Sequence, residues 1–307
     1  MKAMAALAAM AALGLANLAQ AQGTEQHVEC SKCVEWNQPQ TPFQIVGNTY
    51  YVGTSELSSV LITGPEGHIL IDAPLPQSAG IIAANIKALG FKITDVKFIL
   101  NSHAHFDHAG ALAELQRLSG ATVAASVKGA SALEAGTVGA DDPQYDPREV
   151  FRVPKVARVR RVLDAETLRV GALAVKANYT PGHTPGGTSW SWSACEQGKC
   201  YDVVYADSLT PISTDGFLYT RDEKGEDRSA AFRASIARVA ALKCDVIVAA
   251  HPGFTDMLEK LAARTAAGAS STKAASAANP FIEGDGCRRY AAEAQKRLDV
   301  RLAKERK

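Results

Sequence analysis

Apolar and polar positions alternate along the chain with two different periods, and these periods predict strands and helices in both halves. Residues 43–54 and 58–73 are rich in β-branched and aromatic side chains and are interrupted by Gly-Asn and Pro-Glu-Gly turns, which favours antiparallel strands. Over 81–89 the apolar residues recur with the spacing of a helix. A short apolar run at 96–101 predicts a buried strand that leads into a polar loop. The strands predicted at 43–54 and 58–73 would form an antiparallel meander at the start of the fold.

The same patterns continue through the rest of the chain. Residues 107–120 predict a helix with Asp107 as its N-cap and Gly120 at its end, and 121–127 predict a strand. The second half predicts three strands, a helix, a fourth strand and two terminal helices, at 168–180, 188–194, 200–207, 229–242, 244–250, 255–266 and 286–304. Helices that cover the outer faces of two packed sheets satisfy this order, which is an α/β arrangement.

Three segments show no regular period. Residues 136–148 contain many turn formers, and a loop of that length in a compact domain usually forms a lid or a binding loop. Residues 152–161 form the one basic run, which we interpret as a solvated edge or loop. Residues 265–279 are low in complexity and predict a mobile connector.

The N-terminus has the pattern of a secretory signal. Residues 1–21 carry Lys2 near their start, continue as an Ala- and Leu-rich apolar run and end in the small-residue triplet Ala-Gln-Ala. The alternative, a membrane anchor, is disfavoured because the apolar run is too short and too rich in Ala to span a bilayer core of about 30 Å. We therefore expect residues 1–21 to be removed and residues 22–307 to form one domain, with no membrane attachment after cleavage.

The charge balance gives no sign of a nucleic-acid partner, and we expect none. The chain has 33 basic and 32 acidic side chains, and removal of the signal takes away one Lys and no acid. No stretch combines clustered Lys and Arg with aromatic side chains for stacking, as binding to nucleic acids requires.

Six cysteines in an exported chain predict disulfides, because oxidising compartments leave few thiols free. Six cysteines allow fifteen pairings. Spacing favours a local bridge across the short turn at 196–199 and a small loop within "CSKC", and the remaining pair would tie the C-terminal helix to the body. The predicted pairs are Cys195 with Cys200, Cys30 with Cys33, and Cys244 with Cys287. A structural zinc site built on "CSKC" is the alternative, but no second C-x-x-C accompanies it.

Ionisable side chains gather at the predicted ends of three strands, where they can converge without belonging to the core. Five of the seven histidines take part, together with one Asp: His103, His105, Asp107, His108, His183 and His251. The other two, His27 and His68, fall in the N-terminal tail and in a hairpin, and we interpret both as surface residues.

This set predicts a metal centre. In an extended segment, residues two apart point to the same side, so His103 and His105 can ligate one ion. The turn into the following helix re-aims Asp107 and His108, which can face a second ion. Imidazole and carboxylate ligands with no nearby thiolate suit Zn²⁺. A catalytic zinc site uses such ligands and leaves a position for water.

The motifs resemble those of a known family. "HAHFDH" at 103–108 is the H-x-H-x-D-H signature of the metallo-β-lactamase superfamily. "TPGHTPGGTSWSW" at 180–192, "YADSLTPIS" at 205–213 and "CDVIVAAHPG" at 244–253 are similar to the third subclass of the true metallo-β-lactamases. The resemblance runs from about residue 42 to the C-terminal helix. It implies an αββα sandwich of two mixed sheets with helices on the outer faces.

The resemblance also implies site residues. A first Zn²⁺ would be held by His103, His105 and His183, and a second by Asp107, His108 and His251. Asp107 would in addition be catalytic, by directing a hydroxide that the two ions share. Ser208 and Thr210 match positions that bind the carboxylate of the substrate. The resemblance agrees with a disulfide between Cys244 and Cys287.

The sequence also supports expectations for other residues near the site. Thioesterase-like and lactonase-like relatives place a metal-bridging Asp near the position of Asp207, whereas we expect Asp207 to support the site from behind the ligands. The loop 136–148 should border the cleft, with Tyr145 as an apolar contact. Trp190 and Trp192 alternate along a strand, so we expect them to pack in the core.

The function implied is that of a periplasmic, monomeric, di-zinc β-lactamase acting on a small-molecule β-lactam and conferring antibiotic resistance. The substrates would be penicillins, cephalosporins and carbapenems. The alternative is another hydrolase of the same superfamily, acting on a lactone or a thioester. A zinc-binding protein without catalysis is disfavoured, because two three-ligand sites leave an open position on each ion.

Overall fold

The computed structural model describes residues 27–148, 152–221, 225–269 and 279–306. The predicted signal at 1–21 lies outside these ranges, as do residues 270–278 of the predicted connector. Residues 265–269, which we expected to belong to that connector, instead complete a helix.

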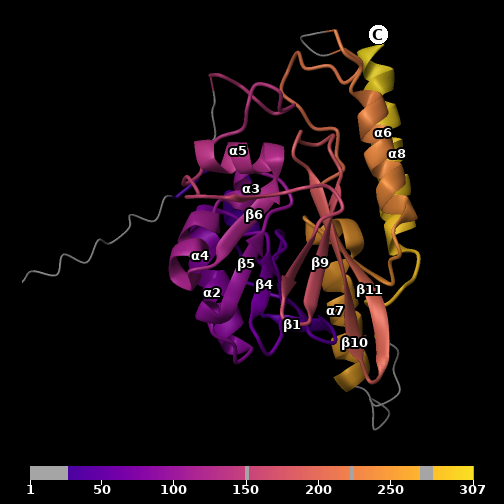
Figure 1. The fold of residues 1–307 in the computed structure, drawn as a ribbon. Helices are drawn as coiled ribbons and strands as arrows, with labels where there is room; N and C mark the ends of the chain where they lie inside the picture. The colour runs from indigo at the N-terminus through magenta and orange to yellow at the C-terminus, as the bar shows by residue number, and fades with distance from the viewer. Residues whose placement is uncertain (1–26, 149–151, 222–224, 270–278, 307) are drawn as a thin grey trace, which may run out of the picture.

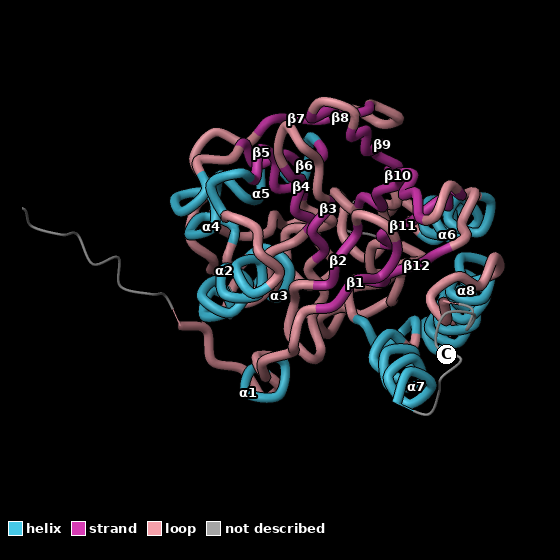
Figure 2. Tube along the Cα trace, turned by 90° about the horizontal axis from the view of Figure 1, so that it is seen from below, coloured by secondary structure: helices cyan, strands magenta, loops and turns pink. Residues whose placement is uncertain are grey.

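Two sheets pack face to face, and helices cover their outer faces (Figure 1). Helices α2, α4 and α5 lie against the first sheet, and α6 and α8 lie against the second (Figures 1 and 2). The prediction of two packed sheets with outer helices is therefore confirmed. Aromatic side chains fill the space between the sheets, with Tyr51, Trp190 and Tyr205 fully buried there. Trp192 belongs to the same core, as predicted.

The first sheet is mixed, with seven strands in sequence order. Pairs β1 to β4 are antiparallel, and β4 to β7 are parallel. Its strands are β1 (Phe43–Val46), β2 (Thr49–Tyr51), β3 (Val60–Ile62), β4 (His68–Ile71), β5 (Val96–Leu100), β6 (Thr122–Ser126) and β7 (Arg160–Val162). Part of the basic run 152–161 thus pairs as the edge strand β7.

The second sheet has five strands in the order β12-β11-β10-β9-β8. β12 and β11 are parallel, and the other neighbouring strands of this sheet are antiparallel. Its strands are β8 (Thr167–Val170), β9 (Leu173–Tyr179), β10 (Thr188–Glu196), β11 (Lys199–Ala206) and β12 (Val246–Ala249).

The α-helices include two that the sequence patterns did not predict, α1 and α5. The α-helices are α1 (Cys33–Trp36), α2 (Ala79–Ala88), α3 (Phe106–Ala109), α4 (Leu112–Ser119), α5 (Val127–Ala135), α6 (Ser229–Ala241), α7 (Met257–Ala269) and α8 (Gly286–Glu305). Short 3₁₀ turns are η1 (Pro76–Ser78), η2 (Ile93–Asp95) and η3 (Pro252–Thr255). Among the described residues, no helix combines the length and the apolar character needed to cross a membrane.

The predicted helix 107–120 is wrong in its first half. The chain forms the short α3, breaks at Gly110 and Ala111, and resumes as α4, which ends at Gly120 in the left-handed conformation as predicted. The N–H of Ala111 donates to Pro74 O at 2.9 Å, outside the helix, which accounts for the break. Asp107 is not the N-cap, because its carboxylate faces two histidines instead.

His68 is also not a surface residue. It is buried in β4, where its ring meets the ring of Phe91 edge-on at 5.0 Å and the N–H of Gly64 approaches its Nδ1 at 3.4 Å. His27, in contrast, is exposed as predicted.

The structure contains all three predicted disulfides. Cys30 pairs with Cys33, Cys195 with Cys200, and Cys244 with Cys287. The last bridge joins the segment just before β12 to the first turn of α8, so it ties the C-terminal helix to the second sheet.

Candidate metal centre

The carboxyl ends of parallel strands gather the site. β4 and β5 are parallel in the first sheet, and β11 and β12 are parallel in the second, so each pair ends at one edge. The histidine motif follows β5, Asp207 follows β11, and His251 follows β12. Strand-end loops can carry chemistry because their side chains are not needed in the core.

A buried Asp fixes the start of the histidine motif. Asp72 accepts from the N–H of Ser102 at 2.7 Å and from its hydroxyl at 2.6 Å. The hydroxyl of Tyr205 donates to the same carboxylate at 2.8 Å. Asp72 adopts a left-handed backbone conformation (φ 59°), which few side chains other than those of Asp and Asn tolerate. The loop that carries His103 is therefore fixed by the hydrogen bonds of Asp72.

Three histidines form the first cluster. The ring centroids of His103, His105 and His183 lie 4.9 Å from one another in every pairing, and all three residues are buried. One nitrogen of each lies within 4.8 Å of the others. Such an arrangement can hold one metal ion.

Asp107, His108 and His251 form the second cluster. Asp107 Oδ2 lies 3.3 Å from His108 Nε2 and 3.4 Å from His251 Nε2, and the two nitrogens are 3.3 Å apart. Ligands at about 2.0–2.1 Å from a tetrahedral ion are about 3.3–3.4 Å from one another. The triangle therefore has the dimensions of one face of a tetrahedral metal site. His103, Asp107 and His108 also lie within 4.8 Å of one another, so the two clusters adjoin.

The protonation states of His103, His183 and Asp107 suit metal binding. Burial lowers the pKa of His183 to about 3 and holds the pKa of His103 well below its ordinary value, so both rings are neutral at pH 7. Burial opposes the charge of Asp107, but the neighbouring His108 and His251 outweigh it and hold the pKa of this carboxyl well below its usual range. Neutral imidazole and ionised carboxylate are the forms that ligate metals.

Polar groups orient the histidines from behind. Asp207 Oδ1 lies 2.8 Å from His103 Nδ1, Asp142 Oδ1 lies 3.1 Å from His105 Nε2, and the carbonyl of Thr210 lies 2.8 Å from His183 Nδ1. Partners on the far nitrogen fix the ring orientation and the tautomer of a metal-ligating His. Asp207 contacts the edge of His103 that faces away from the cluster, which is the supporting position that we expected and not a bridging one.

One buried ring nitrogen without a partner fits a metal ion. Nε2 of His103, the nitrogen that Asp207 does not contact, is buried and has no hydrogen-bond partner. Buried polar atoms are almost always paired, so an unpaired ring nitrogen in a cluster of ligands indicates a missing partner. Together with the triangle of Asp107, His108 and His251, the residues present fit a metal centre with nitrogen and oxygen donors.

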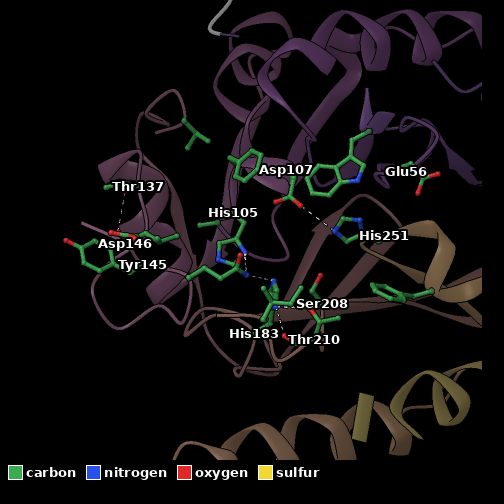
Figure 3. A pocket seen from close by; sticks show the side chains of 18 of the residues that line it. Glu56, His105, Asp107, Thr137, Tyr145, Asp146, His183, Ser208, Thr210 and His251 are labelled. Atoms are coloured by element: carbon green, nitrogen blue, oxygen red, sulfur yellow. Dashed lines mark hydrogen bonds and ion pairs between the residues drawn. The ribbon is translucent and has the colours of Figure 1, made fainter. Parts of the chain in front are cut away.

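A pocket of about 510 Å³ opens above the clusters (Figure 3). Its lining includes ligands from both clusters, Ser208, Thr210 and residues of the loop 136–148, among them Tyr145. The loop thus borders the cleft as predicted. The hydroxyl of Thr210 lies 3.1 Å from His183 Nδ1, so in this structure it contacts a histidine and not open space.

The sequence reasoning missed four residues of the site. Asp72 and Asp142 support the ligands, as described above. The amide of Gln144 lies 3.4 Å from ring nitrogens of both His105 and His183. Trp36 of α1 meets the ring of His251 edge-on at 5.5 Å. Of these four, only Asp72 could have been identified from the sequence, because it directly follows a buried strand.

Comparisons with known proteins agree with this geometry. The family model of the metallo-β-lactamase superfamily matches residues 53–194. The chain is 45% identical to the Rm3 metallo-β-lactamase, with a TM-score of 0.85, and the match covers 91% of this chain and 100% of that one. The chain belongs to the metallo-β-lactamase superfamily.

Other members show the same likeness. MEM-A1, a subclass B3 metallo-β-lactamase from a soil metagenome library, is 48% identical, with a TM-score of 0.82 over 88% of this chain and 98% of that one. The hydroxyacylglutathione hydrolase of Maricaulis maris is 34% identical over 116 residues, which is 38% of this chain and 34% of that protein. The chain thus spans only about a third of the length of this curated relative.

Proposed function

We propose that the chain is an exported zinc-dependent β-lactamase that hydrolyses the amide bond of penicillins, cephalosporins and carbapenems. The observation that carries this proposal is the extent of the likeness. The chain matches all of Rm3 at 45% identity, but only 34% of the hydroxyacylglutathione hydrolase of Maricaulis maris. A likeness over the full length of a β-lactamase supports a shared substrate class more strongly than a match to a third of a thioesterase.

Two Zn²⁺ ions would occupy the centre. His103, His105 and His183 would hold one, and Asp107, His108 and His251 the other. When bound, such ions lower the pKa of a coordinated water from about 15.7 toward 7 and polarise a carbonyl group. The absence of any thiolate among the described residues of the pocket agrees with an all-nitrogen-and-oxygen ligand set.

The side chains of this protein would position the reactants. Asp107 turns Oδ2 toward His108 and His251, so its other oxygen can accept a hydrogen bond from the attacking water and direct it at the carbonyl carbon. Ser208 lines the pocket and can donate its hydroxyl to the carboxylate of the substrate. Thr210 can contribute there only if its hydroxyl turns away from His183. Asp207 and Asp142 keep the histidine rings aligned during the reaction.

A thioester or lactone hydrolase is the second candidate. It is favoured by the curated relatives, since hydroxyacylglutathione hydrolases match the chain at 30–34% identity. The position of Asp207 argues against it. A metal-bridging Asp would have to reach the ion, whereas Asp207 binds the far side of His103.

A substrate panel tests the proposal. The zinc-loaded protein should hydrolyse a chromogenic cephalosporin, benzylpenicillin and a carbapenem with kcat/KM values far above those for S-lactoylglutathione and an acyl-homoserine lactone. A strong chelator should abolish the activity, and Zn²⁺ should restore it. Faster turnover of the thioester or the lactone would overturn the proposal, and indifference to chelation would remove the metal from it.

We also propose export and a monomeric state. Residues 1–21 have the composition of a signal peptide, so the mature chain should begin at Gln22 in the periplasm. There it would destroy β-lactams before they reach their targets and so confer resistance. N-terminal sequencing of protein from a periplasmic extract and light scattering of the purified chain test both points.

A further inference from the structure

The pocket contains one carboxylate that the proposed reaction does not use. Glu56 belongs to the lining of the 510 Å³ pocket. Figure 3 shows it near His251, at the end of the pocket away from Tyr145 and Asp146. In the described part of the chain, no hydrogen bond or ion pair joins Glu56 to another residue. A carboxylate that lines a pocket without a protein partner is available to a ligand.

The segment that carries Glu56 is fixed on both sides. The hydroxyl of Thr54 donates to Trp36 O at 2.6 Å, which ties the segment to α1. The N–H of Ser58 donates to Ala250 O at 2.9 Å, which ties it to the end of β12 just before the candidate ligand at 251. The backbone position of Glu56 is therefore set by the same elements that build the site.

Two aromatic rings pack near His251, which Figure 3 shows close to Glu56. The ring centroids of Trp36 and Phe254 lie 5.5 and 6.0 Å from that of His251, and both residues line the pocket. The guanidinium of Arg297 lies 4.7 Å from the ring centroid of Phe254, so that ring already has a cation. Trp36 is left to receive one from a ligand. A carboxylate beside an aromatic face is suited to an ammonium or pyridinium group.

Among the charged side chains of the pocket, Glu56 is the one available to bind a cationic group of a ligand. The described lining contains no Lys or Arg and three acids, Glu56, Asp107 and Asp146. Asp107 faces the candidate metal ligands, and Asp146 forms an ion pair with Arg148 at 2.8 Å. Lys32 acts on Glu56 electrostatically, but it is more than half exposed, so water screens it.

We propose that Glu56 is a specificity-determining residue that binds a cationic substituent of the substrate. The inference rests on the proposed β-lactamase function and names a preferred class within it, β-lactams that carry an ammonium or pyridinium group in addition to their carboxylate. The carboxylate of such a substrate would lie toward Ser208, and its cation would lie between Glu56 and Trp36.

Matched substrate pairs test the assignment. Ampicillin differs from benzylpenicillin by one ammonium group on the acyl side chain, and cephaloridine differs from cephalothin by a pyridinium in place of an acetoxy group at C3. In Glu56→Gln the ratio of kcat/KM, cationic over neutral, should fall about threefold to tenfold for at least one pair, mainly through KM. Glu56→Lys should lower that ratio further. In the wild type, added salt should reduce the ratio, because screening weakens the attraction.

Glu66→Gln is the matched control, because Glu66 is an exposed glutamate in the turn between β3 and β4, at the opposite end of these strands from Glu56. It should leave every ratio unchanged. If the wild type hydrolyses all four compounds and neither Glu56 variant shifts a ratio, the assignment of Glu56 is overturned while the proposed function stands. An equal loss on both members of each pair also overturns it, since that would indicate a structural role. If the wild type hydrolyses none of them, both proposals fail.

Discussion

Asp207 holds His103 from behind, with 2.8 Å between Asp207 Oδ1 and His103 Nδ1. Both side chains are fully buried. The contact leaves Nε2 of His103 as the nitrogen that faces the ligand cluster. Because such a carboxylate fixes the orientation and the tautomer of a metal-ligating ring, Asp207 should influence metal affinity without touching the metal.

We expect Asp207→Asn to weaken zinc binding by about 10-fold to 100-fold. A competition titration against a chromophoric chelator measures the affinity directly. Asp202→Asn, on the same strand but away from the site, serves as the control and should bind zinc like the wild type. Wild-type affinity in the Asp207 variant would show that the ring needs no support from this carboxylate.

Removal of the Asp107 side chain should affect both metal content and catalysis. Asp107→Ala takes away one atom of the 3.3–3.4 Å triangle and the acceptor proposed to direct water. We expect fewer than two zinc ions per chain after dialysis, and a loss in kcat/KM of about 100-fold or more. Elemental analysis and steady-state kinetics on one preparation measure both. Full turnover with two bound zinc ions would contradict the assigned role.

The end of α8 should contribute stability that depends on pH. The side chain of Glu305 is 3% exposed and accepts from the N–H groups of Tyr219 and Thr220 and from Arg301 Nε at 2.7 Å. Burial opposes its charge, but these donors outweigh burial and lower the pKa of Glu305 below its ordinary value. The stabilisation should therefore be fully present above about pH 4.3, the value for an unfolded glutamate, and be lost as pH falls through the folded pKa.

Glu305→Gln should thus lower Tm at pH 7 by about 2–4 °C, for a loss of about 1–2 kcal/mol. Thermal unfolding followed by circular dichroism should show a smaller difference from the wild type at pH 3. Glu293→Gln, at a more exposed position of α8, should change Tm little. A Tm difference that stays constant with pH would show that the charge of Glu305 does not matter.

The disulfides should rank by the length of chain that they close. Cys244–Cys287 spans 43 residues and Cys195–Cys200 spans 5. Chain-entropy arguments give about 4 kcal/mol for the first and about 2 kcal/mol for the second. The double variant Cys244→Ser/Cys287→Ser should therefore lose more free energy of unfolding in urea than Cys195→Ser/Cys200→Ser. The opposite order would mean that strain or residual structure, not loop length, dominates.

The fold was predictable where periodicity was strong. The strand at 96–101, the helix at 229–242 and the β12 run at 244–250 all correspond to elements of the structure. Helix α5 was missed because "VKGASALEA" is rich in small residues and has no clear apolar stripe. The single helix expected at 107–120 failed for a tertiary reason, since Ala111 bonds to Pro74 instead of continuing α3.

The candidate site could be predicted from the sequence only for residues whose type and position have few explanations other than metal binding. Five histidines and one Asp at three strand ends are hard to explain without a metal, and the structure brings all six side chains together. Asp142 and Gln144 could not be identified as site residues from the sequence, because polar residues in a turn-rich loop usually hydrogen-bond within that loop. Their contacts with His105 depend on how that loop folds over the pocket, which no local pattern encodes.

Gly187 closes off the space behind the site. A β-carbon on it would lie 2.3 Å from Asp207 Oδ2 and 2.6 Å from Thr180 O. The carboxylate that supports His103 therefore fills the volume that any other residue type at 187 would require. A shorter side chain at 207 would not by itself make room at 187, because the backbone carbonyl of Thr180 would still lie 2.6 Å from the new β-carbon. Position 187 should therefore stay glycine even in relatives that have replaced the aspartate.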